Sequence, residues 1–580
     1  MSESPRPIPV PRRPADGPDR LDSWKEIAAF FGREVRTVQG WEKNEALPVH
    51  RHQHAKQGSV YAFRSELDAW RNARKGVAEA APVSAVPPPP ASNRRAILLV
   101  SGCVLLAILA SLLIWRNRAG NSPLSSVVVL PFLDMSPQKD QEYFSDGLTE
   151  EIIDGLSRVP NLRVVARTSA FAFKGKSDDI RQIGRQLNVD AVLEGSVRKS
   201  GQDLRITAQL NRVSDGTHLW SRTYDRKLRD VFTVQQEIAQ SIAKQLQAGD
   251  VPLAAPAGNL EAYTRYQEGL YFFNQHQVPD SYWKAIERYH EAIRVDPTMA
   301  RAYAGMADAY AYLAENFAVW PKEVFPKAEE AAEKAVALDD NLAEGHTSRG
   351  IVKLDYEWDQ DGARREFRRA LQLDPGSGWV HHWVAHSLEA QGKLDEAMKE
   401  MRAALALDPL SIPIHWDIAN ELLSAGRIDE AAQFLDRAEE LFPGYPIIEF
   451  QRAEAKYLRG DRLTAARIVE TLLTKSPELV NVPSFLGFKG VAAAWAGRRA
   501  EGQKILDQLE QMRKTRYVEP VTTMQLCAAL GDREALMLWS RRAYEDRSPL
   551  MLYAPMASYF YNDDAGVKAY LAKTLPKSGT

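Results

Sequence analysis

The 580-residue sequence has few of the residues that build covalent or metal-based stability. Its two cysteines, Cys103 and Cys527, lie in very different segments, which excludes a disulfide framework and a cysteine-based zinc site. The 74 Lys and Arg residues and the 76 Asp and Glu residues leave a formal net charge of −2. Overall charge therefore gives no indication of nucleic-acid binding, and a basic surface would have to be local.

The sequence also lacks the motifs of the common enzyme classes. It has no HExxH and no GxSxG, and its acidic residues do not pair into a recognisable acid/base couple. Gly175-Lys176-Ser177 lies between a predicted strand and a predicted helix, as in a phosphate-binding loop. That loop needs a glycine where Ala170 stands, and Phe171 would crowd the phosphates. We therefore predict that the chain is not an enzyme and has no cofactor.

One long apolar run is present, at residues 96–115 with the sequence AILLVSGCVLLAILASLLIW. Twenty helical residues span about 30 Å, the hydrocarbon thickness of a bilayer. Arg94, Arg95 and Arg116 flank the run, and Trp115 stands at its interfacial edge. The run is too long and too far from the N-terminus for a cleavable signal peptide. It predicts one transmembrane helix.

Composition and hydrophobic pattern divide the rest of the chain into segments. The predicted domains are a disordered tail at 1–20, a compact unit at 21–76, a Pro/Ala-rich linker at 77–95, an α/β sandwich domain at 126–248 and an all-helical array at 259–580.

The compact unit begins with two short predicted helices. Ser23-x-x-Glu26 is typical of a capping box, and Gly32 provides the turn that ends the first helix. A second helix starts near Glu34 and turns its apolar residues inward. Two short helices with three or four residues between them form a helix-turn-helix. Residues 49–54 and 59–63 then read as the strands of a wing, followed by a helix at 65–74.

The segments LDSWKEIAAFFGREVRTVQGWEKNEALPVHRH and GSVYAFRSELDAW resemble the MerR/excisionase-type winged helix-turn-helix family. The resemblance implies that the second helix enters the major groove and that the wing contacts the backbone. Relatives usually have a basic residue where Gly40 stands, and a protein-docking unit of the same shape is the alternative. By position, the DNA-facing residues would be Arg36, Thr37, Gln39 and Lys43 on the helix and Arg51 and Lys56 on the wing.

Three histidines alternate on the first strand of the predicted wing, at positions 50, 52 and 54. Alternation places them on one face, where they could bind Zn²⁺ or titrate near neutral pH. Exposed polar wing residues are the interpretation that we favour.

The predicted α/β domain contains the sequence segments VVVLPF, FSDGLTEEI, VVARTSAFAFKGK, DAVLEGSVRKSG and HLWSRTYDR. These segments resemble the TolB amino-terminal-like (FlgO/CsgG-related) domains of bacterial envelope and signalling proteins. The resemblance implies an interaction domain outside the cytoplasm or near the membrane, without established catalysis.

The C-terminal array repeats itself with a period of 34 residues, which is the period of tetratricopeptide repeats (TPR). Helix ends recur at Pro297, Asp340, Pro375, Pro409, Pro443 and Pro477. A small residue recurs twelve positions before the proline, at Ala285, Ala363, Ala397, Ala431 and Ala465. A bulky residue recurs eight positions before it, at Tyr289, Phe367, Met401, Leu435 and Val469. Glycine recurs at the turn inside the pair, at Gly392, Gly426 and Gly460.

We therefore predict about eight stacked helix pairs with a concave groove for extended or helical peptides. His382 and His386 are spaced i, i+4 and could share a metal ion. Trp383 and Ala385 beside them favour ordinary packing, so the sequence predicts no metal ligand.

Together these features predict a membrane-anchored transcriptional regulator and signal transducer. A DNA-binding unit must be cytoplasmic, so the α/β domain and the repeats would lie beyond the bacterial inner membrane. That order resembles membrane-tethered regulators of the CadC kind. The predicted partners are DNA, a protein or peptide in the TPR groove, the membrane through residues 96–115, and a second copy in a homodimer. The alternative is a membrane-anchored TPR scaffold for envelope or secretion assemblies without DNA binding.

Overall fold

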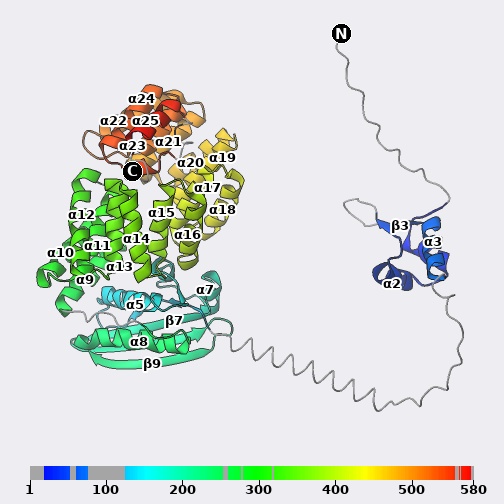
Figure 1. The fold of residues 1–580 in the computed structure, drawn as a ribbon, viewed down its shortest axis with the longest axis horizontal. Coiled ribbons are helices and arrows are strands. Elements are labelled where there is room, and N and C mark those ends of the chain that lie inside the picture. Colours follow the sequence, from blue (N-terminus) through cyan, green and yellow to red (C-terminus); the bar gives the residue numbers. More distant parts are fainter. Residues whose placement is uncertain are drawn as a thin grey trace, which may run out of the picture. The chain divides into compact units, whose positions relative to one another are not determined.

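The computed structural model describes residues 19–51, 60–75, 124–251, 259–275, 279–316, 319–555, 561 and 564–575. The chain forms two compact units, Met1–Asn117 and Arg118–Thr580 (Figure 1). The predicted membrane span at 96–115 lies outside the described residues, as do most of the predicted tail and linker.

Each helix in the described ranges is too short or too polar to cross a lipid bilayer. A crossing needs about 20 consecutive apolar residues. The long helix Pro321–Leu338, for example, carries the charged residues Lys322, Glu323 and Glu329. Within the described residues, this finding contradicts the prediction of a single-pass inner-membrane protein with a cytoplasmic N-terminus and an extracytoplasmic C-terminal region.

The described part of the N-terminal unit combines three helices with a small antiparallel sheet. Ser23 Oγ accepts a hydrogen bond from the Glu26 N–H at 3.2 Å, and Gly32 ends the first helix with φ +62°. Ile27, Val38 and Leu67 are fully buried between the helices and the sheet, whose order is β1-β3-β2. The elements are β1 (Arg20–Leu21), α1 (Trp24–Phe31), α2 (Val35–Glu45), β2 (His50–Arg51), β3 (Val60–Phe63) and α3 (Arg64–Lys75).

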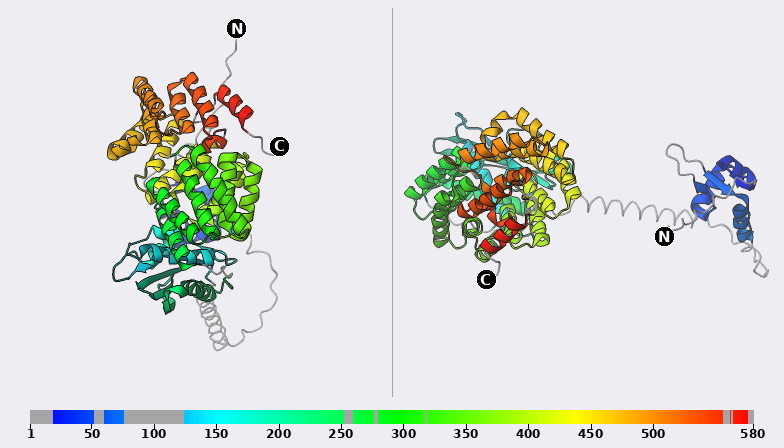
Figure 2. Two further views of the ribbon diagram at one scale, coloured as in Figure 1. Left: turned by 90° about the vertical axis from the view of Figure 1, so that its left-hand side faces the viewer. Right: turned by 90° about the horizontal axis from the view of Figure 1, so that it is seen from above.

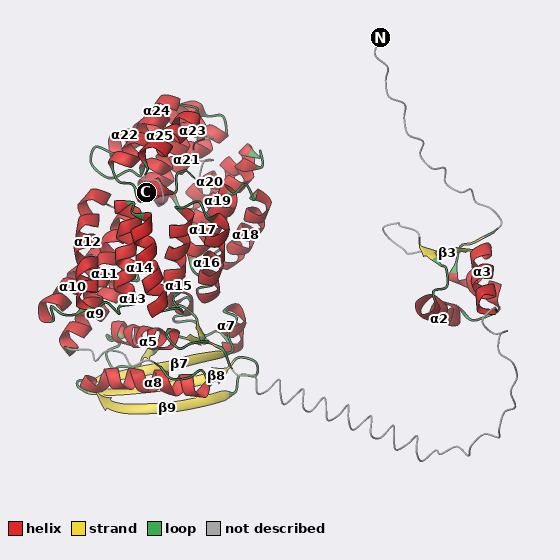
Figure 3. Ribbon diagram, in the orientation of Figure 1, coloured by secondary structure: helices red, strands yellow, loops and turns green. Residues whose placement is uncertain are grey.

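The second unit begins with the α/β domain, a sheet of order β6-β4-β7-β8-β9 with β5 paired to β7 (Figure 3). Strands β6, β4 and β7 are parallel, whereas β7, β8 and β9 are antiparallel. The elements are β4 (Ser126–Val129), β5 (Leu133–Asp134), α5 (Glu142–Ser157), β6 (Arg163–Val164), α6 (Arg167–Phe171), α7 (Ile180–Gln186), β7 (Ala191–Ser200), β8 (Asp203–Arg212), β9 (His218–Lys227), η1 (Leu228–Asp230) and α8 (Val231–Gln245).

One face of this sheet is buried and the other is not. Along β8, Leu204, Ile206 and Leu210 are buried, while Arg205 between them pairs with Asp225 on the outer face. This alternation is that of a sheet covered on one side. Helices α5 and α8 contact each other and cover the buried face.

In its described residues, the remainder of the second unit is a solenoid of eight helix pairs followed by a final helix. The pairs are α9 (Leu260–Phe273) with α10 (Pro279–Val295), α11 (Ala300–Glu315) with α12 (Pro321–Leu338), α13 (Ala343–Val352) with α14 (Gln360–Leu373), α15 (Gly378–Glu389) with α16 (Leu394–Leu407), α17 (Ile412–Ser424) with α18 (Ile428–Leu441), α19 (Pro446–Leu458) with α20 (Arg462–Lys475), α21 (Pro483–Trp495) with α22 (Arg499–Met512), and α23 (Pro520–Leu530) with α24 (Arg533–Glu545). The short helices η3 (Pro477–Asn481) and η4 (Pro549–Leu552), the π-helix η2 (Lys353–Glu357) and α25 (Ala565–Thr574) complete it.

The residues that recur with the 34-residue period form the core and the turns of the solenoid. All five predicted alanines are fully buried, and the five bulky residues eight positions before each helix end are at most 1% exposed. Gly392, Gly426 and Gly460 have φ of +72°, +71° and +87°, which favours glycine at the turn inside each pair. The predicted TPR architecture is confirmed.

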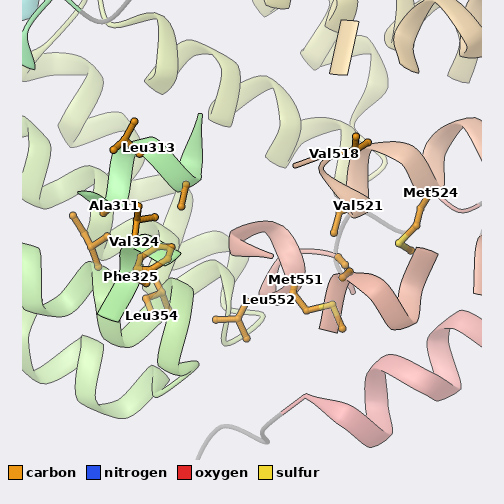
Figure 4. Packing of buried hydrophobic residues seen from close by; sticks show 14 of the residues in the cluster. Ala311, Leu313, Val324, Phe325, Leu354, Val518, Val521, Met524, Met551 and Leu552 are labelled. Carbon is orange, nitrogen blue, oxygen red and sulfur yellow. The ribbon is translucent and has the colours of Figure 1, made fainter. Parts of the chain in front are cut away.

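The last pair folds back against the early pairs and closes the array. Arg547 Nη1 donates to the Tyr356 carbonyl at 3.2 Å, and the Arg547 guanidinium lies 4.3 Å from the Trp358 ring centroid. Met551 and Leu552 of η4 are buried between helices of the second and third pairs and those of the eighth (Figure 4). The solenoid therefore packs part of its own C-terminal segment against its inner helices.

Candidate functional site

The exposed face of α2 carries most of the residues predicted to contact DNA. Arg36, Thr37 and Lys43 are exposed and Gln39 is half-buried, while Val38 points into the core. Positions 36 and 43 are two helical turns apart, so both cations lie on one side of the helix. A Cβ added at Gly40 would meet nothing within 4 Å. The face thus has room for a larger side chain at that position.

The wing adds Arg51 to the surface predicted to contact DNA, while Lys56 lies outside the described residues. Arg51 Nη2 lies 2.7 Å from Glu42 Oε1 of α2, and the Arg51 side chain is 65% exposed. This ion pair joins the wing strand to α2 but neutralises part of the local positive charge. His50 Nε2 lies 2.8 Å from Glu66 Oε2, and the other two alternating histidines are not among the described residues.

A second candidate surface is the junction where the α/β domain docks on the turns between TPR pairs. The Ala166 N–H donates to the Leu407 carbonyl at 2.8 Å, and Ser157 Oγ donates to Asp374 Oδ1 at 3.1 Å. Figure 2 shows the α/β domain against the early helix pairs, far from α24 and α25. The two domains therefore form one body rather than two linked modules.

Charged groups complete this junction. Arg301, in the first turn of α11, lies 2.9 Å from Glu151 and 2.9 Å from Asp154 of α5. The three side chains are 24%, 15% and 24% exposed, so water screens the ion pairs only in part. Burial raises the pKa of Glu150 to about 7, and burial also raises the pKa values of Asp374 and Asp408 to about 6.

The third candidate is a polar cluster on the first helices of successive TPR pairs. His382 Nε2 lies 2.6 Å from Asp417 Oδ2 and 3.1 Å from His386 Nε2. His386 Nε2 lies 3.4 Å from Asp417 Oδ2, and its Nδ1 lies 2.9 Å from Glu389 Oε2. Against the opposing effect of burial, Glu389 and Asp417 raise the pKa of His386 well above its usual value. Burial by itself would raise the pKa of Asp417, but the positive charge of His386 outweighs burial and lowers this pKa.

Further buried carboxyl groups surround this cluster. Burial raises the pKa of Asp355 to about 7 and that of Glu421 to about 8. Asp355 Oδ1 accepts a hydrogen bond from Tyr553 Oη at 3.1 Å, which ties the cluster to the C-terminal segment. The sequence indicated the two histidines but not Asp417. Because Asp417 lies 35 residues after His382, the 34-residue period places it near the equivalent position of the next pair.

Two family comparisons match parts of the chain. Residues 124–241 match the second domain of HilA/YgeH-like transcriptional regulators. Residues 359–420 and 388–457 match the tetratricopeptide repeat family. The chain thus contains a HilA-like regulator domain and TPR repeats. The resemblance of the α/β domain to TolB amino-terminal-like domains is not confirmed, since the match names a different family.

A curated relative named "Putative adenylate cyclase 3", from Rhizobium meliloti (strain 1021), is 41% identical over 191 residues. The match covers 31% of this chain and 32% of the relative, so the chain spans about a third of that protein's length. The prediction that the chain is not an enzyme is contradicted by this relative, because the absence of motifs tested only the common enzyme classes.

Solved structures of helical-repeat proteins are also similar. Human IFIT1 with m7Gppp-AAAA is 15% identical with a TM-score of 0.40, covering 59% of this chain and 77% of that one. A thermophilic TPR protein from Thermus thermophilus is 20% identical with a TM-score of 0.29, covering 33% and 98%.

Proposed function

We propose that the chain is a transcriptional regulator in which α2 of the N-terminal unit reads DNA and the second unit receives the signal. The match of residues 124–241 to the second domain of HilA/YgeH-like transcriptional regulators carries the proposal. In this chain that domain also follows a small unit with two helices in helix-turn-helix order.

The exposed face of α2 supports a role in DNA recognition. Arg36 and Lys43 supply phosphate or base contacts, and Thr37 and Gln39 lie beside them. Arg51 extends this surface onto the wing. The ion pair with Glu42 must open before the guanidinium can bind a phosphate, so Arg51 contributes less than a free cation would.

The second unit supports a role in signal reception. TPR arrays bind proteins and peptides, and the rigid junction with the α/β domain would transmit a change in the array to that domain. A homodimer would place two α2 helices on two half-sites, which a single small unit needs for useful affinity.

The test is selection of genomic DNA fragments by the full-length chain, followed by footprinting of the enriched fragments. Specific protection that weakens as salt increases supports the regulator. Each contact between a cation of the protein and a DNA phosphate releases counterions, so the affinity falls as the salt concentration rises. If no fragment is enriched even at low salt, the regulator is excluded in favour of a TPR scaffold without DNA binding.

An activity on nucleotides is a second candidate, favoured by the 41% identity to the relative named for adenylate cyclase. The test is incubation of the full-length chain with ATP and Mg²⁺ or Mn²⁺, with cyclic AMP measured by mass spectrometry. Cyclic AMP in excess of a heat-inactivated control would establish this activity, and its absence with every metal tested would exclude it.

A further inference from the structure

Three potential metal-ligand atoms meet between helices α15 and α17. They are the Nε2 atoms of His382 and His386 and an Oδ2 atom of Asp417, with separations of 2.6, 3.1 and 3.4 Å. In a tetrahedral zinc site with bonds of about 2.0–2.1 Å, ligand atoms are about 3.3 Å apart. Two of the three separations are already near this value, and a small rotation of the carboxylate corrects the third. The ligand atoms that the three residues offer all lie within 4.8 Å of one another.

Hydrogen bonding around the cluster also fits a metal site at one histidine. His386 Nδ1 lies 2.9 Å from Glu389 Oε2, and Glu389 is 7% exposed. A carboxylate in this position fixes the ring so that Nε2 points at the ion. The Nδ1 atom of His382 has no hydrogen-bond partner among the described residues. We therefore expect moderate affinity rather than the very tight binding of a fully supported site.

A fourth side chain points independently to a missing ligand. Glu421 lies one helical turn after Asp417 on α17 and is 5% exposed. Neither of its carboxylate oxygens has a hydrogen-bond partner within the described part of the chain. Buried carboxylates are normally hydrogen-bonded, paired with a cation or bound to a metal. Glu421 thus presents two buried oxygen atoms that are free to accept hydrogen bonds or bind an ion.

The ligand set of the cluster suits a dication. Asp417 supplies a carboxylate, and the two histidines supply neutral imidazole nitrogens when they act as ligands. Two imidazoles and a carboxylate form a ligand set that suits zinc and its neighbours in the first transition series better than Ca²⁺ or Mg²⁺.

We propose that His382, His386 and Asp417 bind one divalent transition-metal ion of the zinc class, with a water molecule as the fourth ligand and Glu421 as the acceptor for that water. The ion joins the fourth and fifth helix pairs of the array. Its ligands also contact the C-terminal segment, because the rings of His386 and Tyr553 are 5.4 Å apart.

The test uses the full-length chain, stripped of metal with a chelator and titrated with Zn²⁺ by calorimetry. The histidines of the wing are another imidazole set, so all measurements are made with His52→Gln and His54→Gln in the background. The expected result is one equivalent of Zn²⁺, and Co²⁺ in its place should give the strong visible absorption of four-coordinate cobalt. A chain that binds neither ion stoichiometrically overturns the proposal.

Variants separate this site from other histidines. His386→Gln and Asp417→Asn should each weaken Zn²⁺ binding by more than the roughly tenfold to hundredfold that loss of an outer-shell partner costs, and each should abolish the cobalt absorption. The matched control is His415→Gln, since His415 is also buried on α17 but bonds the Ser411 carbonyl at 2.8 Å. Zn²⁺ affinity in either variant equal to that of the control overturns the proposal. If circular dichroism shows that one variant does not fold, the Zn²⁺ affinity of the other variant and the cobalt spectrum of the background chain decide whether the proposal stands.

Discussion

Asp408 joins the TPR array to the α/β domain by accepting two hydrogen bonds from Ser169. The Ser169 N–H donates to Asp408 Oδ1 at 3.0 Å, and the Ser169 hydroxyl donates to the same oxygen. The Leu410 N–H in turn donates to Ser169 Oγ at 2.7 Å. Asp374, the equivalent residue 34 positions earlier, likewise accepts a hydrogen bond from the Ser157 hydroxyl. The helix-end turns that reveal the repeat in the sequence are thus also the docking points of the neighbouring domain.

Burial of these aspartates predicts that the junction weakens as pH rises. Their pKa values are raised from 3.8 to about 6, so the folded state favours the protonated form. The stabilisation is complete below about pH 4 and is lost as pH rises through about 6. For Asp408 the change amounts to about 3 kcal/mol. Urea unfolding at several pH values between about 3.5 and 7 measures it.

The control for this prediction is Asp408→Asn, which keeps an oxygen acceptor for Ser169 but cannot ionise. The variant should lose less stability than the wild type over the same pH range. Parallel stability curves for the two proteins would show that Asp408 is not the titrating group.

Arg301→Leu should destabilise the second unit by about 3 kcal/mol, because it leaves Glu151 partly buried without its cation, while Asp154 keeps only Arg158. The matched control is Arg288→Leu, since Arg288 has similar exposure at 27% but pairs only within the first helix pair. The control should change stability by about 1 kcal/mol or less. Chemical unfolding measures both, and equal effects would contradict a special role of Arg301 at the junction.

Gly376→Ala should separate the α/β domain from the TPR array, whereas Gly147→Ala should not. A Cβ at position 376 would lie 2.4 Å from the Ser157 carbonyl oxygen, which belongs to the backbone and cannot move alone. A Cβ at position 147 would clash with the side-chain end of Gln267, which can swing away. Limited proteolysis should therefore cut Gly376→Ala faster near residues 157–166. The same digestion rate for both variants would contradict close docking at Gly376.

Much of the fold could be predicted from the sequence because the repeat is local and periodic. The buried alanine row, the bulky row from Tyr289 to Val469 and the left-handed glycines follow directly from a 34-residue spacing. In the α/β domain the alternation of apolar and polar side chains along β8 is typical of a strand with one covered face. The short helix α6 could not be predicted, because five residues give too little periodicity to detect.

The candidate sites were less predictable because they depend on contacts between distant segments. Asp417 meets His382 only when two helix pairs stack, and Ser169 meets Asp408 across 239 residues of sequence. Closure of the solenoid by η4 was not expected either, since no local pattern marks where a C-terminal segment will pack.

Gly40→Arg should strengthen DNA binding, because it adds a cation to the exposed face of α2 where nothing obstructs the side chain. It should also stabilise the helix, since glycine costs about 1 kcal/mol relative to residues with good helix propensity. Gly40→Ala is the control that shares the helix effect but adds no charge. Fluorescence anisotropy with a selected DNA fragment measures both, and equal affinities of the two variants would place α2 away from DNA.

The most direct test of the regulator is the salt dependence of DNA binding by the full-length chain and by the double variant Arg36→Ala, Lys43→Ala. The matched control is Arg71→Ala, which removes an exposed cation from α3 instead of α2. If α2 lies on DNA, the double variant should bind the selected fragment at least tenfold more weakly than the control at moderate salt. Its salt slope should also fall by about 2, one for each lost cation. An affinity and a slope equal to those of the control would contradict the account.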